Sequence, residues 1–442
     1  MHGLWNRHAQ RKPVPPAGSG NPAIFVQRLG LDIDVGDGYP GLHSYAWNLG
    51  LDQDTIFLSD LSGVTEILSL EQMSHFAAVS FTEIAPVYDF LDRPSVENAI
   101  KQRWAECKAV PYDPVDSLIL GVAALGCLLD RDGTSPFDTA RDLERRLVYS
   151  ARVALEYSSQ LPHPSISHVI AWLLRVIYLR LTSSPHATWM ASCTLMHMIE
   201  TTKLHFDAET SSPLARPPGR VDCTPEQRRK IYHTAQLFNT WISLDCGKSQ
   251  VELHGASTKI PTVGEGGWTG AQVGLYQLSI FLAPQYPREF TELETALVQL
   301  SHLDPSHPML KLLQCNIALC IFRRATALGR TLSDSSLQTI VSLMRGSLAA
   351  ATELAARSLP WWHVLNIPFQ IVCVVLAMEQ RDAAEVVILG EALETVRLVA
   401  TRYRTHMAEE AYAVAVGLVR RRRERQLEFV RVLDQTLEGH ER

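Results

Sequence analysis

The chain has 442 residues, of which 46% are hydrophobic and 20% are charged, and its formal net charge is −6. This composition is ordinary for a globular protein and excludes a disordered chain, a fibrous repeat and a small disulfide scaffold. The negative balance also excludes the strongly basic type of stand-alone nucleic-acid binder. Eight cysteines are scattered without a C-x2-C pair, which favours a reducing compartment.

Residues 1–55 are predicted to form a flexible leader that contains proline and glycine. Residues 13–22 read PVPPAGSGNP, a composition typical of a linker. No apolar run follows Met1, so a secretory signal is not expected, and the prolines argue against the amphipathic helix of a mitochondrial presequence. Residues 56–442 are expected to form one helical domain.

From about Ser69 onward, apolar residues recur every three or four positions, as on one face of a helix. The first predicted helix begins with a capping box at Ser69 and Gln72. Others are predicted at 113–129, 142–157, 165–181, 189–204, 226–244, 290–303, 308–327, 335–359, 364–379, 382–403 and 406–437. Alternation with a period of two is nearly absent. The predicted fold class is therefore all-α, a large domain of about a dozen orthogonal or stacked helices.

The most apolar stretch, Val364–Met378, is short for a membrane span and contains Asn366 and Pro368. It is predicted to be a buried core helix, and no membrane association is expected. The frequent aromatic residues on the predicted helices have two interpretations. Core packing is the default, and the alternative is the lining of a small-molecule pocket.

No motif in the sequence predicts catalysis or a cofactor. Gly121 and Gly126 lack the Lys-Ser/Thr of a P-loop, so we interpret them as small residues that let helices approach closely. His197, Glu200 and His205 could hold a metal ion in principle, but such residues are more often satisfied structural side chains. No nucleophile–base pair can be assembled, so catalytic, metal and cofactor sites are all predicted to be absent.

The densest basic cluster consists of Arg420, Arg421, Arg422, Arg423 and Arg425. Two interpretations stay open at this point. The cluster is either a nuclear-import signal or nucleic-acid patch, or a solvated helix face near a C-terminus, where cations suit the helix dipole.

Several segments, in order, carry a resemblance to a known family: 81–91 (FTEIAPVYDFL), 116–129, 165–180 with 187–205, 226–247, and 360–377. The set resembles the fungal-specific transcription factor domain, the helical region that follows a binuclear zinc cluster in many fungal regulators, and covers about residues 56–420. The resemblance implies structural roles for the residues at the family's motif positions, which are Glu226, Arg228, Arg229, Asp245 and Gly247.

Some positions depart from the family pattern. Lys248-Ser249 follows the glycine where the family usually has Arg-Pro, and Tyr232 stands where a Trp is usual. The family's zinc cluster needs C-x2-C-x6-C with a later repeat, and these 442 residues contain no such array.

The resemblance implies a nuclear transcriptional regulator that shuttles with the cytoplasm and controls a metabolic or secondary-metabolite gene cluster. The partners it implies are other transcription regulators or a homodimer, and a small-molecule effector. DNA would be contacted only indirectly or through a zinc cluster outside these residues. Two alternatives stay open: a helical enzyme acting on an apolar metabolite, and a cytoplasmic interaction scaffold.

Overall fold

A computed structural model describes residues 21–22, 25–26, 28–29, 46–51, 63–106, 113–130, 141–158, 164–207, 223–283, 288–378 and 383–440. These residues contain fifteen helices and one isolated β-bridge, between Val263 and Trp268. The helices are α2 (Val64–Ile67), α3 (Leu70–Tyr88), α4 (Arg93–Ala105), α5 (Pro114–Leu129), α6 (Arg141–Ser158), α7 (Ile166–Thr182), α8 (Pro185–Thr201), α9 (Pro225–Cys246), α10 (Gly270–Phe281), α11 (Phe290–Ser301), α12 (Pro308–Ala327), α13 (Asp334–Ala356), α14 (His363–Ala377), α15 (Ala383–Tyr403) and α16 (His406–His440).

The predicted all-α class is confirmed, and most predicted helices lie within a few residues of the observed ones. The capping box at Ser69 and Gln72 is present at the start of α3. Helices α4 and α10 were not predicted. The apolar pattern predicts a helix that begins at Trp189, whereas α8 begins at Pro185, because proline is well suited to the first turn of a helix.

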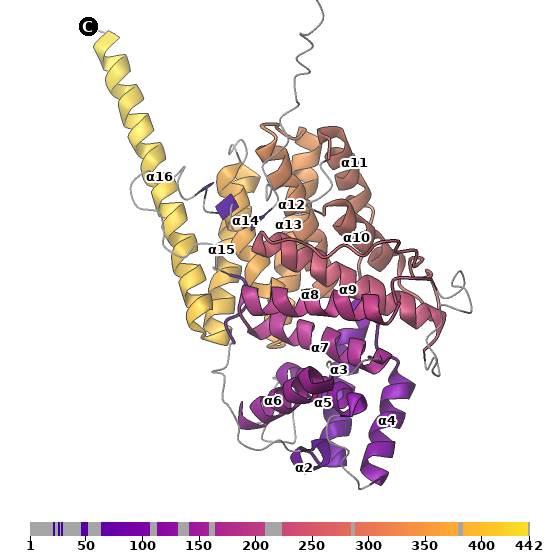
Figure 1. The fold of residues 1–442 in the computed structure, drawn as a ribbon. Coiled ribbons are helices and arrows are strands. Elements are labelled where there is room, and N and C mark those ends of the chain that lie inside the picture. The colour runs from indigo at the N-terminus through magenta and orange to yellow at the C-terminus, as the bar shows by residue number, and fades with distance from the viewer. Residues whose placement is uncertain are drawn as a thin grey trace, which may run out of the picture.

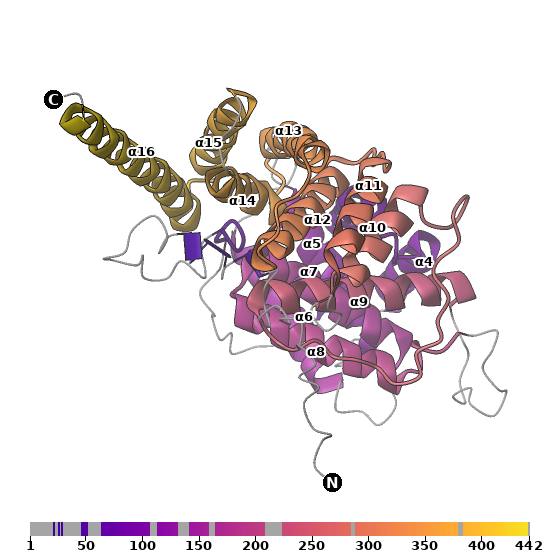
Figure 2. The same ribbon diagram turned by 90° about the horizontal axis from the view of Figure 1, so that it is seen from above.

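The helices form three groups along the chain. Helices α2–α6 lie at one end of the molecule, α8 and α9 cross its middle side by side, and α10–α15 lie beyond them (Figure 1). Helix α5 is the centre of the first group and packs against α3, α6 and α7, whereas α14 packs against α12, α13, α15 and α16. The second half of α16 extends away from the rest of the molecule in both views (Figures 1 and 2).

Helix α5 approaches α3 closely because residue 126 has no side chain. A Cβ atom built on Gly126 would lie 2.1 Å from the backbone oxygen of Phe76, which no side chain at this position could accommodate. The prediction that Gly126 allows close helix packing is therefore confirmed.

The helical core is dominated by aliphatic and aromatic side chains. Most of the aromatic residues that could have lined a pocket are buried in this core, whereas Trp104 and Trp189 are partly exposed. In the described part of the chain, no helix has the length and apolar character that crossing a bilayer requires.

Candidate functional site

Arg180, near the end of α7, is a deeply buried charge, with 1% of its surface exposed. Its guanidinium lies between the indole rings of Trp47 and Trp362, 3.6 Å from each ring centroid. One Nη atom donates to Asp245 Oδ2 at 3.0 Å, and the other donates to the Trp47 carbonyl oxygen at 2.7 Å. Two aromatic faces and a carboxylate thus replace the water around this cation.

Burial opposes the charged state of both members of the Arg180–Asp245 pair. It lowers the pKa of Arg180 to about 10, although Asp245 acts in the opposite direction. Burial also raises the pKa of Asp245, against the influence of Arg180 and Arg323. Arg180 is still protonated at neutral pH, so the pair acts as a charged contact that depends on both partners being present.

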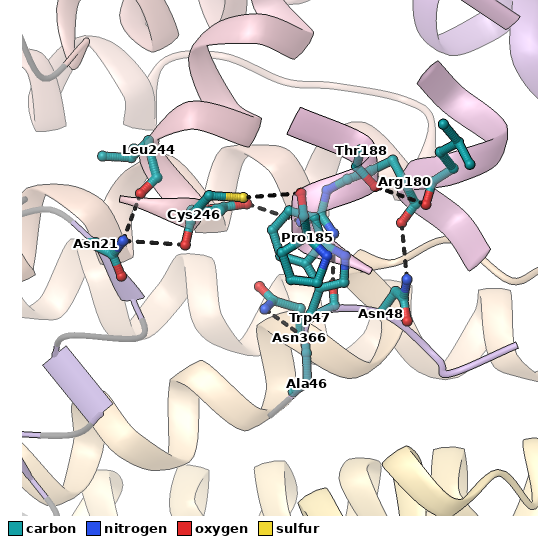
Figure 3. Close-up of polar contacts among 12 residues, drawn as sticks. Asn21, Ala46, Trp47, Asn48, Arg180, Pro185, Thr188, Leu244, Cys246 and Asn366 are labelled. Carbon is teal, nitrogen blue, oxygen red and sulfur yellow. Dashed lines mark hydrogen bonds and ion pairs between the residues drawn. The ribbon is translucent and has the colours of Figure 1, made fainter. Parts of the chain in front are cut away.

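A short segment, residues 46–51, contacts the end of α7, α14 and the residue before α16, and we call it the bridging segment (its contacts with α7 and α14 are drawn in Figure 3). Trp47 Nε1 donates to the Ser183 carbonyl at 3.1 Å, and Asn48 Nδ2 donates to the same oxygen at 2.9 Å. From the other side, the Asn366 side chain donates to the Ala46 carbonyl at 2.8 Å, and the Thr405 hydroxyl donates to the Leu49 carbonyl. The bridging segment therefore connects helices from distant parts of the chain.

The assignment of residues 1–55 to a flexible leader stays a prediction for the residues outside the described ranges. The described residues of this region are largely buried: Asn21 is 2% exposed, and Ala46 and Leu49 are fully buried. Asn21 Nδ2 donates to the carbonyl oxygens of Leu244 and Asp245, at 3.0 and 3.2 Å, in the last turn of α9 (Figure 3).

The end of α9 also explains the glycine of the family motif. Gly247 follows the helix with φ = 62°, in the left-handed region that favours glycine. A Cβ atom there would lie 2.9 Å from the side-chain nitrogen of Asn21. The missing side chain of Gly247 thus leaves room for Asn21, which binds the carbonyl of Asp245.

The other three motif residues lie at the opposite end of α9. Arg229 makes two hydrogen bonds to Asp207, at 3.0 and 3.3 Å, and a weaker one to Glu226 at 3.4 Å. Glu226 also accepts from the backbone N–H of Thr262 at 2.7 Å. Arg228 donates to the Lys203 carbonyl at 3.2 Å. These contacts hold the loop that contains Asp207 and the loop that contains Thr262 against the start of α9.

His363, beside the Arg180 site, is buried and carries no charge-stabilising contact. Its ring stacks on Trp362, with 3.3 Å between the centroids, and neither of its nitrogens has a hydrogen-bond partner among the described residues. Burial and the nearby Arg180 hold its pKa well below the usual range. A neutral His363 is therefore compatible with the buried cation, whereas a second positive charge would not be.

The structure separates the three residues considered for a metal site. His197 and Glu200 are exposed on α8, with 3.8 Å between His197 Nδ1 and Glu200 Oε2. His205, in contrast, is 2% exposed and its ring contacts that of Phe206. Among the described residues, no group of three His, Cys, Asp or Glu side chains is arranged to hold a metal ion.

The basic cluster lies on α16. Arg420, Arg423 and Arg425 are exposed, and Arg421 and Arg422 are partly exposed. These arginines are far along the chain from the Arg180 site and belong to the part of α16 that begins to leave the body of the molecule (Figure 1).

Sequence reasoning missed Arg180 as a site residue. A signal was present, because Arg175 and Arg180 interrupt the otherwise apolar run of 169–181. A charge in such a run is expected to find a buried partner or a path to solvent. The sequence does not show that the partner is Asp245.

Two hollows bear on the predicted effector. One, between α5, α6 and α7, has a volume of about 20 Å³, which is close to that of one water molecule. The other is an open groove of about 760 Å³ between α13 and α15, lined by Thr352, Arg397, Thr401, Arg402 and others. The effector stays a prediction, and Arg397 of this groove is already paired with Glu394.

Comparison with known proteins gives a consistent result. The chain is 36% identical over 411 residues to the transcription factor kojR of Aspergillus oryzae, covering 92% of this chain and 72% of that protein. It is 32% identical over 398 residues to the protein RDR1 of Gibberella zeae, with coverage of 90% and 71%. It is 28% identical over 422 residues to the protein RDR1 of Saccharomyces cerevisiae, with coverage of 93% and 73%.

The profile of the fungal specific transcription factor domain matches residues 80–344, which include α5, α7 and α9 with the Arg180–Asp245 pair. The resemblance seen in the sequence is thereby confirmed. The chain belongs to the family of fungal transcription factors that share this domain.

Proposed function

We propose that this chain regulates transcription in the nucleus and that its targets are the genes of a metabolic or secondary-metabolite cluster. The observation that carries the proposal is the 36% identity to a transcription factor over 92% of the chain. The chain acts as a regulatory domain rather than an enzyme, in keeping with its family. DNA is reached through a partner or through a zinc cluster outside these 442 residues, since they contain no C-x2-C-x6-C array.

The domain transmits its input through the Arg180 site. Residues from α7, α9, α14 and the bridging segment meet around one guanidinium, so a shift of any of these elements changes the contacts of the others. A partner or an effector that binds one arrangement more tightly than another would shift the population of the whole domain.

The proposal is tested by tethering and by deletion. The full chain is fused to an unrelated DNA-binding module upstream of a reporter gene, and the transcripts of a deletion strain are compared with those of its parent. We expect altered reporter output and altered transcripts from a physically clustered set of genes. An unchanged reporter together with unchanged transcripts would contradict regulation and favour the cytoplasmic scaffold.

The input route is tested in the same reporter strain with Asn48→Ala. This change removes the hydrogen bonds to the carbonyls of Ser183 and Arg180 and the one that Asn48 Oδ1 accepts from the Gly50 N–H, and it leaves the Arg180–Asp245 pair in place. Ser74→Ala, on the exposed face of α3, is the matched control because its hydroxyl bonds only within its own helix. We expect altered reporter output with Asn48→Ala at equal protein level, and none with the control.

Nuclear import is assigned to the basic cluster on α16. We expect a fluorescently tagged chain to accumulate in the nucleus and a variant with Arg420, Arg421, Arg422, Arg423 and Arg425 all changed to Gln to lose this accumulation. Because these arginines are exposed or partly exposed, we expect the variant to fold like the wild type. Equal nuclear accumulation of both chains would assign the cluster to a solvated helix face.

A further inference from the structure

The bridging segment, residues 46–51, is attached to the helical body without being part of any helix. It is held by hydrogen bonds that each join a side chain to a backbone carbonyl, and by the stacking of Trp47 on Arg180 (Figure 3). Among the described residues, no hydrogen bond joins its backbone to another backbone group. The segment can therefore leave its place without breaking a helical hydrogen bond.

The backbone of the bridging segment is left-handed at two positions. Ala46 has φ = 57°, which residues with a side chain rarely adopt, and Gly50 has φ = 66°. Gly50 also lies against the start of α16, where a Cβ atom would be 2.6 Å from Met407 Cβ. The docked conformation, which is the one in the structure, is thus imposed by the surrounding helices rather than preferred locally.

Burial of apolar side chains opposes the release of this segment. Leu49 is fully buried and Trp47 is 6% exposed, so the docked state is the major one. Release exposes only a short segment, however, and therefore requires less free energy than unfolding of the helical core. The released state is a minor state in equilibrium with the docked one.

Release would change the surroundings of Arg180 most of all. It removes the indole that covers one face of the guanidinium and the carbonyl that accepts from Nη1. Asp245 and Trp362 stay in place, because Asp245 belongs to α9 and Trp362 is the residue before α14. Arg180 thus keeps its carboxylate and becomes accessible to water on the face that Trp47 had covered.

We infer that the bridging segment is a latch, which leaves the helical body as a unit while the helices stay folded and thereby uncovers Arg180. The inference deepens the proposed function, because it names the element that moves when an input arrives, and its regulatory meaning rests on that function. Release itself is measured on the purified chain without any transcription, so the latch and the proposed function can fail separately.

The first experiment measures access to Arg180. The full chain is treated with phenylglyoxal, which modifies accessible arginine side chains, and mass spectrometry follows the labelling of each position over time. Arg180 and Arg323 are both 1% exposed, so both are protected while the chain is docked and folded. We expect Arg180 to be labelled at least about tenfold faster than Arg323, because release uncovers only Arg180. Equal rates would mean that reagent reaches Arg180 only after global unfolding and would overturn the latch.

Gly50→Ala tests whether docking controls this access. The new Cβ atom meets Met407 in a backbone conformation that disfavours alanine, so docking is weakened while Arg180 and its partners are unchanged. Gly329→Ala is the matched control, since Gly329 has the same φ of 66° but nothing within 4 Å of a new Cβ atom. We expect Gly50→Ala to raise the ratio of Arg180 to Arg323 labelling at least about tenfold, and the control to leave it unchanged. An unchanged ratio in Gly50→Ala would refute the latch.

The same two variants test the regulatory meaning of release. In the reporter strain, Gly50→Ala should change the output in the same direction as Asn48→Ala, because both changes weaken docking. Gly329→Ala should leave the output at the wild-type level. Accelerated labelling of Arg180 in Gly50→Ala with an unchanged or oppositely changed output would overturn the role of the latch in transmitting the input.

Discussion

The two ends of α9 both hold a buried arginine–carboxylate pair, but they differ in what the pair connects. At the N-terminal end, Arg229 binds Asp207, 22 residues away in the sequence, and Glu226 within the same helix. At the C-terminal end, Asp245 binds Arg180, whose other contacts come from Trp47 and Trp362. The first pair fastens neighbouring loops, whereas the second joins segments from both ends of the chain.

This difference teaches where a change of state can be transmitted. Loss of the Arg229 pair releases local loops, but loss of the Arg180 pair affects α7, α9, α14 and the bridging segment at once. Coupling between distant sites requires an element whose alternative arrangement is shared by many neighbours. The C-terminal end of α9 has this property, so the comparison can be tested by disturbing each end in turn.

The largest difference is expected from Asp245→Asn compared with Asp207→Asn. The first leaves the Arg180 charge buried between two indoles without its carboxylate, which should cost about 3–5 kcal/mol of unfolding free energy. The second should cost about 1–2 kcal/mol, because Arg229 keeps Glu226. Urea unfolding measures both. Equal losses would mean that the two ends do not differ.

Truncation of a buried tryptophan tests which residues are energetically coupled to Asp245. Trp47→Ala and Trp268→Ala remove buried indoles near the C-terminal and N-terminal ends of α9, and each should cost about 3 kcal/mol. Combined with Asp245→Asn, the Trp47 change should be non-additive by more than about 0.5 kcal/mol, and the Trp268 change additive. Unfolding free energies of the single and double variants provide the cycle. Additivity in both cases would argue against a connected Arg180 site.

Lowering the pH should reduce the free energy of unfolding through His233, in the N-terminal half of α9. Its ring contacts Tyr276 Oη at 2.7 Å and the Lys259 carbonyl at 2.9 Å, and burial lowers its pKa to about 4. Since the folded pKa lies below the usual 6.5, the unfolded chain binds a proton first as the pH falls. This histidine's contribution, at most about 3 kcal/mol, is thus present above pH 6.5 and lost between pH 6.5 and 4.

The check is urea unfolding of wild type and His233→Gln at several pH values. The wild type should lose more unfolding free energy than the variant between pH 6.5 and 4. Arg229 contributes to the lowered pKa of His233. Both proteins should also lose some stability through His363, whose own pKa is lowered in the folded chain. Parallel pH profiles for the two proteins would assign the acid sensitivity to other groups.

The smallest effects are expected from the caps of α9. Thr224→Ala removes the side chain that accepts from the Gln227 N–H at 3.1 Å, and Asn21→Ala removes the donor to Leu244 and Asp245. Each should cost about 1 kcal/mol. Thermal unfolding compares them directly. The Asn21 change should additionally raise proteolysis near residue 21, because it releases a segment from the helical body, and Thr224→Ala should not.

Much of the fold could be predicted from local patterns. The helix at 308–327 was predicted with its observed bounds, since Pro308 fits a first turn and a long apolar run follows. Helix α4 was missed because few of its residues are apolar, and Val96 and Ile100 are its only buried hydrophobic side chains. Helix α10 was missed because it begins at Gly270, directly after a loop rich in glycine.

The Arg180 site could not be predicted in the same way. Asp245 was found through a family motif, but its partner is 65 residues away and the indoles around it are farther still. Local periodicity shows which face of a helix is apolar, not which distant residue fills the space opposite it. The apolar side chains of Leu427 and Leu433 on α16 illustrate the reverse case, because their spacing was part of a predicted helix while their exposure appeared only in the structure.

The bridging segment also sets a limit on how this protein can fold during synthesis. Its Ala46 carbonyl accepts from Asn366, and its Leu49 carbonyl accepts from Thr405, across 320 and 356 residues of sequence. Translation proceeds at about 5–20 residues per second, so residues 46–51 wait on the order of 20–70 seconds for these partners. During that interval, Trp47 and its neighbours are available to chaperones, and the Arg180 site is completed only after Trp362 has been synthesised.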